Sequence, residues 1–263
     1  MGKWALVTGA ANGIGFELAR LLSSDDFNLV LVDLNVENLQ EKREILEKEF
    51  KNEIHTKALN LGRQDAALEV YDFVESKGVA LDVLVNNAGF GVFGAFSESD
   101  WEREQEMIFL HVNTPTQLVK LFLPGMIERK SGRILNVSSM AAFHPGPLMS
   151  IYYSTKSYLL SFSTSVATEL KGTGVGMTVL CPGITKTGFQ KSVGAGKPKI
   201  NWNMACAQSV AAYGYKAMMK GEILAVPGLF NNALLVLRRF LPYPVLGKCV
   251  RYIQERNRQK HTV

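Results

Sequence analysis

A glycine-rich turn follows a short apolar run at the start of the chain and leads directly into a helix-like segment. The run covers 3–8, the turn reads TGAANGIG over 8–15, and the next residues read FELARLLSS. Glycine allows a tight turn and lets the backbone approach a ligand closely, while a helix N-terminus offers free N–H groups to an anion. A strand, a glycine turn and a helix in this order are typical of a dinucleotide-binding loop. We therefore expect a cofactor pyrophosphate to contact Gly9, Asn12, Gly13, Ile14 and Gly15.

Apolar runs alternate with amphipathic segments along most of the chain. We expect strands at 3–8, 27–32, 54–59, 81–85, 133–137, 175–180 and 222–226. We expect helices at 36–50, 64–77, 98–109, 112–129, 152–171 and 204–220. Strands and helices that alternate at this spacing form a parallel sheet covered on both faces. The pattern predicts an α/β fold, a single-domain Rossmann-type doubly wound parallel sheet of about seven strands with helices on both faces.

The length and composition agree with one globular domain. The chain has 263 residues, 47% of them hydrophobic and 20% charged, which suffices for one large core. No repeat or linker divides it, so we treat 1–263 as one domain with its core at 3–227. The scattered Cys181, Cys206 and Cys249 favour reduced thiols and a cytoplasmic protein. The first strand begins at once and no apolar run approaches ~18 residues, so we expect neither a signal peptide nor a spanning helix.

Asp33 closes the second apolar run, about 20 residues after the glycine turn. A carboxylate there can accept hydrogen bonds from both hydroxyls of an adenosine ribose, and it would repel a 2′-phosphate. Neither Leu34 and Asn35, which follow it, nor Asn12 in the glycine turn is basic. We therefore expect NAD, with NADP as the alternative. Asp33 could instead cap the helix that begins at Val36, but the preceding glycine turn favours the ribose role.

Tyr152 and Lys156 lie four residues apart in the stretch SSMAAFHPGPLMSIYYSTK at 138–156. On a helix, this spacing places both side chains on one face. An ammonium beside a phenol favours the phenolate, so the pKa of Tyr152 should fall from its reference of ~10. A solvated helix face can carry the same pair by chance, so its meaning depends on the motifs around it.

Together these motifs resemble the short-chain dehydrogenase/reductase family in its classical form. The glycine turn matches TGxxxGxG, and 86–89 read NNAG. Ser139 precedes Tyr152 by thirteen residues, and Lys156 completes YxxxK.

Further matches extend the resemblance over nearly all of 3–227. Residues 182–187 read PGITKT and match PGxxxT, and Asn113 falls where the family has a structural asparagine that relays protons. The chain departs from the family pattern at 154–155, which read Ser-Thr where Ala-Ser is usual, and at Asn60, where many members have Asp.

The resemblance implies hydride transfer between nicotinamide and a carbinol or carbonyl carbon of a small molecule. It implies Tyr152 as general acid or base, Lys156 as its support and a ribose contact, and Ser139 as a donor to the substrate oxygen. Asn113 would fix a water that links Lys156 to solvent. The cofactor contacts implied beyond the glycine turn are Asp33, Asn60, Leu61, Asn87, Ala88, Gly89, Tyr152, Lys156, Pro182, Gly183, Ile184 and Thr187. We expect no metal site.

The residues that we expect around the substrate are mostly apolar. They follow strand ends or lie in a substrate loop at 188–204, and they comprise Ser139, Phe90, Val92, Phe93, His144, Leu148, Met149 and Phe189. Such a lining suits a lipophilic or acyl-chain ketone or alcohol. His144 could bind a polar substrate group, although a lone histidine beside a proline is more often part of loop structure.

The helical tail at 229–260 is apolar first and basic afterwards. Residues 229–241 read LFNNALLVLRRFL, and seven Lys or Arg stand against one Glu between 237 and 260. We interpret the tail as a core-packing helix with a solvated end or as part of a subunit interface. A second interpretation is weak attachment to an anionic membrane surface, because positive charge and exposed apolar residues act together there. The tail lacks a nucleic-acid-binding motif, so we expect no nucleic acid partner.

Three functions stay open at this stage. The first is an NAD-dependent alcohol dehydrogenase or ketoreductase, and the second is an NADPH-dependent 3-oxoacyl- or hydroxysteroid-type reductase. The third is a non-catalytic nucleotide-sensing or scaffold protein on the same fold. Such a scaffold need not keep Ser139, Tyr152 and Lys156 in register, so the motifs favour catalysis. The resemblance also implies a homodimer or homotetramer built through 112–129 and 152–171.

Overall fold

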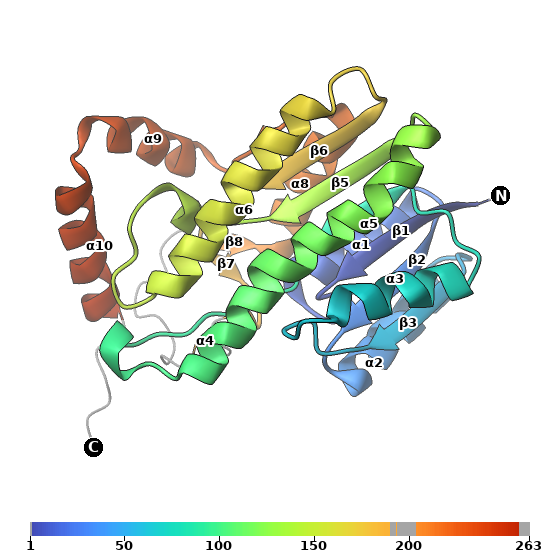
Figure 1. The fold of residues 1–263 in the computed structure, drawn as a ribbon, viewed down its shortest axis with the longest axis horizontal. Coiled ribbons are helices and arrows are strands. Elements are labelled where there is room, and N and C mark those ends of the chain that lie inside the picture. Colours follow the sequence, from blue (N-terminus) through green and yellow to red (C-terminus); the bar gives the residue numbers. More distant parts are fainter. Residues whose placement is uncertain (1, 190–192, 194–203, 258–263) are drawn as a thin grey trace.

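The computed structural model describes residues 2–189, 193 and 204–257, and a seven-stranded parallel sheet lies at its centre (Figure 1). The strands follow the order β3-β2-β1-β4-β5-β6-β9, and all neighbours are parallel. Their bounds are β1 Lys3–Thr8, β2 Phe27–Asp33, β3 Ile54–Ala58, β4 Val83–Asn86, β5 Gly132–Val137, β6 Val175–Leu180 and β9 Leu224–Ala225. The predicted doubly wound sheet is confirmed.

Helices cover both faces of this sheet (Figure 1). The α-helices are α1 Gly13–Ser24, α2 Val36–Glu49, α3 Ala66–Ser76, α4 Trp101–Ile108, α5 Thr114–Glu128, α6 Ser150–Glu169, α8 Ala207–Lys220, α9 Leu229–Leu237 and α10 Tyr243–Asn257. Shorter elements are the 3-10 helices η1 Phe96–Glu98, η3 Met140–Phe143 and η4 Arg238–Phe240, the π-helix η2 Phe109–Asn113, and a small second sheet of β7 Thr185–Lys186 and β8 Ala205–Cys206.

Alternate side chains of each central strand enter two separate cores, because successive side chains of a strand point to opposite faces. Ala5 and Val7 of β1 pack with residues of α1, α2 and α8. Leu6 between them packs with residues of α3 and α5 on the other face. Burial on both faces explains why these strands read as continuous apolar runs.

One junction differs from the sequence prediction. Two separate helices were expected at 98–109 and 112–129, but η2, whose backbone is wound as a π-helix, joins α4 to α5 without a break. A π turn inserts an extra residue into a helix and redirects the side chains that follow. Here it carries His111, which is only 1% exposed, into the interior.

The tail forms α9, η4 and α10, which lie together at one end of the molecule (Figure 1). Of the loop predicted at 188–204, only Gly188, Phe189, Val193 and Met204 belong to the described residues. Within the part of the chain that the structure describes, no helix combines the length and hydropathy needed to cross a bilayer.

Candidate active site

A cleft of about 900 Å³ runs along the carboxyl edge of the sheet. Gly9, Leu34, Asn87 and Ser138 line it, and each directly follows a strand. The strand order reverses between β1 and β4, and ligands of doubly wound sheets bind at such a switch point. We call the part over β1–β3 the cofactor end and the part over β5 and β6 the substrate end.

Most of the predicted site residues line this cleft. Those that do not are Gly15, Val92, Phe93, Asn113 and Leu148. The predicted residues that do line the cleft come from loops and helices far apart in the sequence, and the fold brings them together at one edge of the sheet.

The glycine turn is shaped by contacts that leave no room for side chains. A Cβ atom on Gly15 would lie 2.1 Å from the carbonyl oxygen of Gly9, and one on Gly13 would lie 2.8 Å from Thr187. Gly9 and Gly13 also have positive φ angles of 65° and 55°. Gly15 therefore allows α1 to pack closely against the turn. Gly15 was expected to contact the cofactor, but it does not line the cleft.

The N-terminus of α1 fits an anionic group. Asn12 precedes this helix, but its side chain makes no capping hydrogen bond, so the first N–H groups of the helix stay available. Gly13 and Ile14 of that turn line the cleft. A nicotinamide dinucleotide therefore fits here, with its pyrophosphate on the first turn of α1.

Thr8 and Asn87 fix the spacing between β1 and β4 at the centre of the cleft. The Thr8 hydroxyl donates to the carbonyl of Val85 (3.2 Å) and accepts from the N–H groups of Asn87 (3.0 Å) and Ala88 (3.2 Å). The Asn87 amide donates to the carbonyls of Thr8 and Gly9, both at 3.0 Å. Both side chains therefore brace the glycine turn.

Asp33 lies at the cofactor end with its carboxylate facing the glycine turn. One oxygen accepts from the N–H of Ala11 (2.9 Å) and the other from the N–H of Asn35 (3.2 Å). A carboxylate has about four acceptor sites, so capacity remains for ribose hydroxyls. The helix-cap alternative is wrong, because Asn35 caps α2 by accepting from the N–H of Asn38 (2.8 Å).

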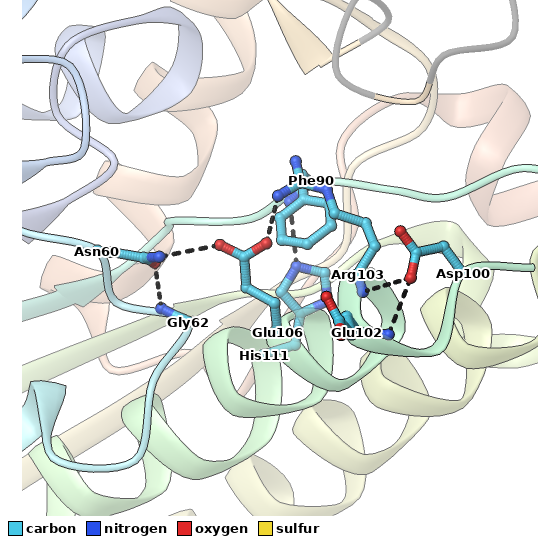
Figure 2. Close-up of polar contacts among 8 residues, drawn as sticks. All are labelled: Asn60, Gly62, Phe90, Asp100, Glu102, Arg103, Glu106 and His111. Carbon is cyan, nitrogen blue, oxygen red and sulfur yellow. Dashed lines mark hydrogen bonds and ion pairs between the residues drawn. The ribbon is translucent and has the colours of Figure 1, made fainter.

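Two residues of α4 that the sequence analysis missed also line the cleft. Figure 2 shows Glu106 between Asn60 and Arg103. The Asn60 amide donates to Glu106 (3.0 Å) and accepts from the N–H of Gly62 (2.8 Å), which fixes its orientation. Arg103 pairs with Glu106 and stacks over the ring of Phe90, with 3.9 Å between the guanidinium carbon and the ring centroid. No local motif marks the hydrogen bond between Asn60 and Glu106, because these residues are 46 positions apart.

Lys156 is a buried cation beside Tyr152. Its ammonium donates to the carbonyl of Val137 (3.0 Å) and lies 5.9 Å from the centroid of the Tyr152 ring. Its side chain forms no ion pair with a described residue, and the residue is only 5% exposed. Burial lowers the pKa of Lys156 from 10.5 to about 8, because the charged form loses its hydration.

The two serines at the end of β5 have different partners. The Ser138 hydroxyl donates to the carbonyl of Lys156 (2.8 Å), so its hydrogen is already used. The Ser139 oxygen accepts from the N–H of Ala141 (3.1 Å), which leaves its hydrogen available to a ligand. This arrangement favours Ser139 as the donor to a substrate oxygen.

His111, not Asn113, lies against Tyr152. The two rings are 5.9 Å apart in an edge-to-face arrangement, whereas Asn113 does not line the cleft. The prediction for Asn113 matched residue type only, and the π turn directs His111 inward instead. The sequence analysis missed His111.

The hydrogen bonds of His111 fix its tautomer. Its Nε2 accepts from the N–H of Phe90 (3.2 Å), as Figure 2 shows, so this nitrogen carries no proton. Its Nδ1 lies 3.0 Å from the hydroxyl oxygen of Thr155, which itself donates to the carbonyl of Tyr152 (2.9 Å). Nδ1 is therefore the protonated nitrogen. Burial, and then the charge of Lys156, hold the pKa of His111 well below its usual 6.5.

The substrate end is largely apolar. Phe90, Met149 and Tyr152 form a buried cluster there, and the ring of Phe189 lies 5.3 Å from that of Tyr152. Phe93 and Val92 were expected to line the pocket, but they do not line it and pack against this cluster instead. Leu148 instead anchors a neighbouring loop, since its carbonyl accepts from the N–H of Gly94 (2.9 Å).

His144 lines the cleft beside Tyr153, with ring centroids 5.4 Å apart. Burial lowers the pKa of His144, and the charge of Arg238 adds to that shift. The histidine is therefore neutral near pH 7 and can bind a ligand as a hydrogen-bonding group without charge.

The tail supplies one wall of the cleft, which the sequence analysis missed. Gln254 of α10 donates to the hydroxyl of Tyr153 (3.0 Å) and so joins the tail to α6. The other tail residues that line the cleft are Phe230, Asn231, Leu234, Leu235, Leu237, Arg238, Leu241, Leu246, Cys249, Val250 and Ile253. Their spacing along 229–254 follows a helical period, which was the available signal.

Among the described residues, no three His, Cys, Asp or Glu side chains gather in an arrangement that would hold a metal ion. Tyr152, Lys156 and His144 are titratable groups that line the substrate end of the cleft, and His111 lies behind Tyr152.

Comparison with known proteins identifies relatives of this chain. A family model described as short chain dehydrogenase matches residues 3–198. Very-long-chain 3-oxoacyl-CoA reductase-B of Danio rerio is 33% identical over 198 residues, which cover 73% of this chain and 62% of that protein. The 17-beta-hydroxysteroid dehydrogenase type 3 of Mus musculus is 33% identical over 190 residues, which cover 69% of this chain and 60% of that protein.

A solved structure agrees with the fold. The short-chain dehydrogenase from Sphingobium yanoikuyae in complex with NADPH superposes with a TM-score of 0.80 at 24% identity. The superposition covers 90% of this chain and 94% of that one.

Proposed function

This chain belongs to the short-chain dehydrogenase family, and we propose that it transfers hydride between a nicotinamide cofactor and a lipophilic secondary alcohol or the corresponding ketone. The observation that carries the proposal is that Ser139, Tyr152 and Lys156 line the same cleft as a glycine turn fitted to a pyrophosphate. The apolar walls of the substrate end support a lipophilic substrate.

Tyr152 handles the proton in this proposal. When bound, the nicotinamide supplies or accepts the hydride. Tyr152 donates its phenolic proton to the substrate oxygen in reduction and removes the hydroxyl proton in oxidation. Lys156, protonated at pH 7 because its pKa is about 8, favours the phenolate by its positive charge. The Ser139 hydroxyl donates to the same substrate oxygen as charge develops there.

NAD is the cofactor that we favour. Asp33 presents a carboxylate at the cofactor end, and its cleft-lining neighbours Leu34 and Asn35 are not basic. A 2′-phosphate would therefore meet the negative charge of Asp33, and neither Leu34 nor Asn35 would supply a compensating cation.

Nicotinamide fluorescence titration with NADH and NADPH tests this preference. We expect NADH to bind more tightly than NADPH. We expect Asp33→Ala to weaken NADH binding and to reduce the difference in affinity between NADH and NADPH. Glu37→Ala is a matched control, because it removes an acidic side chain from the first turn of α2 outside the cleft. Tighter binding of NADPH by the unmodified protein would reject Asp33 as the selector.

An NADPH-dependent 3-oxoacyl- or hydroxysteroid-type reductase is the second candidate. The names of the two relatives described above support it, as does the NADPH complex of the similar structure. The matched segments cover only 60–62% of those relatives' own length, so their substrates are not transferred to this chain. Turnover of 3-oxoacyl thioesters with NADPH would select this candidate. The non-catalytic alternative has no comparable support.

We also propose partners for two surfaces. A homodimer or homotetramer built through α5 and α6 is supported by Tyr158, which is 39% exposed on α6 and stacks on Phe162. A monomer in light scattering after gel filtration would reject this assembly.

The basic tail is proposed to touch anionic lipid surfaces weakly. Leu229 and Phe240, which are 91% and 78% exposed, lie in the same region as Arg239, which is also exposed. Equal sedimentation with neutral and anionic vesicles would reject this contact. A cytoplasmic location remains a proposal that rests on the three free cysteines.

A further inference from the structure

Arg238 brings a positive charge into the apolar substrate end of the cleft. It opens η4, directly after α9, and is one of the tail residues that line the cavity. One terminal nitrogen, Nη1, donates to the carbonyl of Phe143 at the end of η3. The guanidinium carbon lies 5.0 Å from the centroid of the Phe143 ring. These contacts fix the guanidinium next to the loop that follows Ser139.

The remaining edge of this guanidinium has no protein partner among the described residues. Its Nε is buried and makes no hydrogen bond, and Nη2 has none to a described residue. The ion pairs of the described chain all involve other side chains. A buried donor on a charged group is costly to leave unpaired. The Nε–Nη2 edge is also the fork with which arginine binds a carboxylate through two parallel hydrogen bonds.

No carboxylate of the described residues lines this end of the cleft. Of the residues that line the cleft, the carboxylates are Asp33 and Glu106, and both lie at the cofactor end. Asp33 accepts backbone N–H groups of the glycine turn and of Asn35, and Glu106 is paired with Arg103. The residues of the tail that line the cleft together with Arg238 include Leu234, Leu237, Leu241, Leu246 and Val250. A cation in a lining of mostly aliphatic side chains favours a ligand that is apolar over most of its length and anionic at one point.

We propose that Arg238 binds a carboxylate, or another single anionic group, of the substrate. The substrate class is then a lipophilic hydroxy acid or keto acid, with its reacting oxygen at Tyr152 and Ser139 and its acidic group at Arg238. This inference rests on the proposed function for the reacting end, whereas the anion contact stands on the geometry of Arg238 alone.

The neighbouring polar residues fit this assignment. Burial, and to a smaller extent the charge of Arg238, lower the pKa of His144, so His144 is neutral near pH 7. Gln254 is already joined to Tyr153. Arg238 therefore adds a positive charge to the wall of this end of the cleft that the tail supplies.

Isothermal titration of the full chain with decanoate and with decanol tests the anion contact without requiring turnover. We expect decanoate to bind about 10- to 100-fold more tightly, as charge-assisted pairs do. Arg238→Met should abolish that preference while decanol binding is unchanged. Arg239→Met is the matched control, because Arg239 is exposed and does not line the cleft, and it should keep the preference.

The outcomes separate this inference from the proposed function. Equal affinity of the unmodified chain for decanoate and decanol overturns the anion contact, and this comparison needs no variant. An unchanged preference in Arg238→Met also overturns it, because another cation would then be responsible. A carboxylate preference that depends on Arg238, in a chain that transfers no hydride, would support the anion contact and reject the proposed function. If Arg238→Met does not fold, Arg238→Gln gives the same comparison.

Discussion

Lys156 couples folding to pH because its ammonium is buried. Its pKa is about 8 in the folded chain and 10.5 when unfolded, so the folded state binds the proton more weakly. Burial of the charged ammonium therefore destabilises the folded state. This destabilisation is complete below about pH 8 and disappears as the pH rises through 10.5. We expect the wild type to gain about 2–3 kcal/mol relative to Lys156→Met between pH 7 and pH 10. Urea unfolding of both proteins at the two pH values measures this gain, and parallel pH profiles would contradict it.

His111 should make the fold sensitive to acid. Its pKa lies well below 6.5 in the folded chain because of burial, so its stabilising contribution is complete above 6.5 and is lost as the pH falls. Protonating the unfolded imidazole accounts for up to about 2 kcal/mol between pH 7 and pH 5. We expect His111→Asn to flatten this acid limb of the unfolding free energy.

A second effect of His111→Asn identifies it as a positioning residue. The shorter side chain cannot bridge Phe90 and Thr155, so the segment that carries Tyr152 loses a support. We expect kcat to fall while KM for the cofactor is nearly unchanged. A variant with unaltered kcat would show that His111 serves stability only.

At the scale of elements, the turn before α6 packs directly on Tyr153. A Cβ atom on Gly146 would lie 2.0 Å from Cγ of Tyr153, whose hydroxyl accepts from Gln254 of α10. We expect Gly146→Ala to displace the ring, to cost about 1–3 kcal/mol of stability and to speed hydrogen exchange in α10. Gly94→Ala is the control, since a Cβ there has no neighbour within 4 Å. Equal exchange in both variants would mean that Tyr153 does not hold the tail.

The strands could be predicted from sequence to within two residues or so, because each is an apolar run that ends at a polar or glycine residue. The π turn could not, since its extra residue depends on what surrounds His111 in the folded chain. The same holds for Arg103 and Glu106, which reach Phe90 and Asn60 only after α4 packs beside the cleft. Motifs with local spacing could therefore be recognised in the sequence, whereas contacts between distant elements could not be predicted from it.

At the scale of the whole molecule, one edge of a parallel sheet and a helical tail enclose the reaction site. The family match ends at residue 198, whereas α9 and α10, which line the substrate end, lie beyond it. The family match thus includes the cofactor end with Ser139, Tyr152 and Lys156, and we propose that the tail selects this chain's substrate. The sequence analysis interpreted the tail as a core-packing helix, a subunit interface or a membrane contact, and none of these interpretations included a wall of the cleft.

The most direct test of hydride transfer follows deuterium from 4-deuterated NADH into lipophilic ketones and keto acids by mass spectrometry. We expect label on the carbinol carbon of the product with the wild type. With Tyr152→Phe we expect at least ~10²-fold slower incorporation at nearly unchanged NADH affinity, as for loss of a general acid. Equal rates in the two proteins would remove Tyr152 from the mechanism. NADH binding without any transfer of label would contradict the assignment of this cleft as an oxidoreductase site.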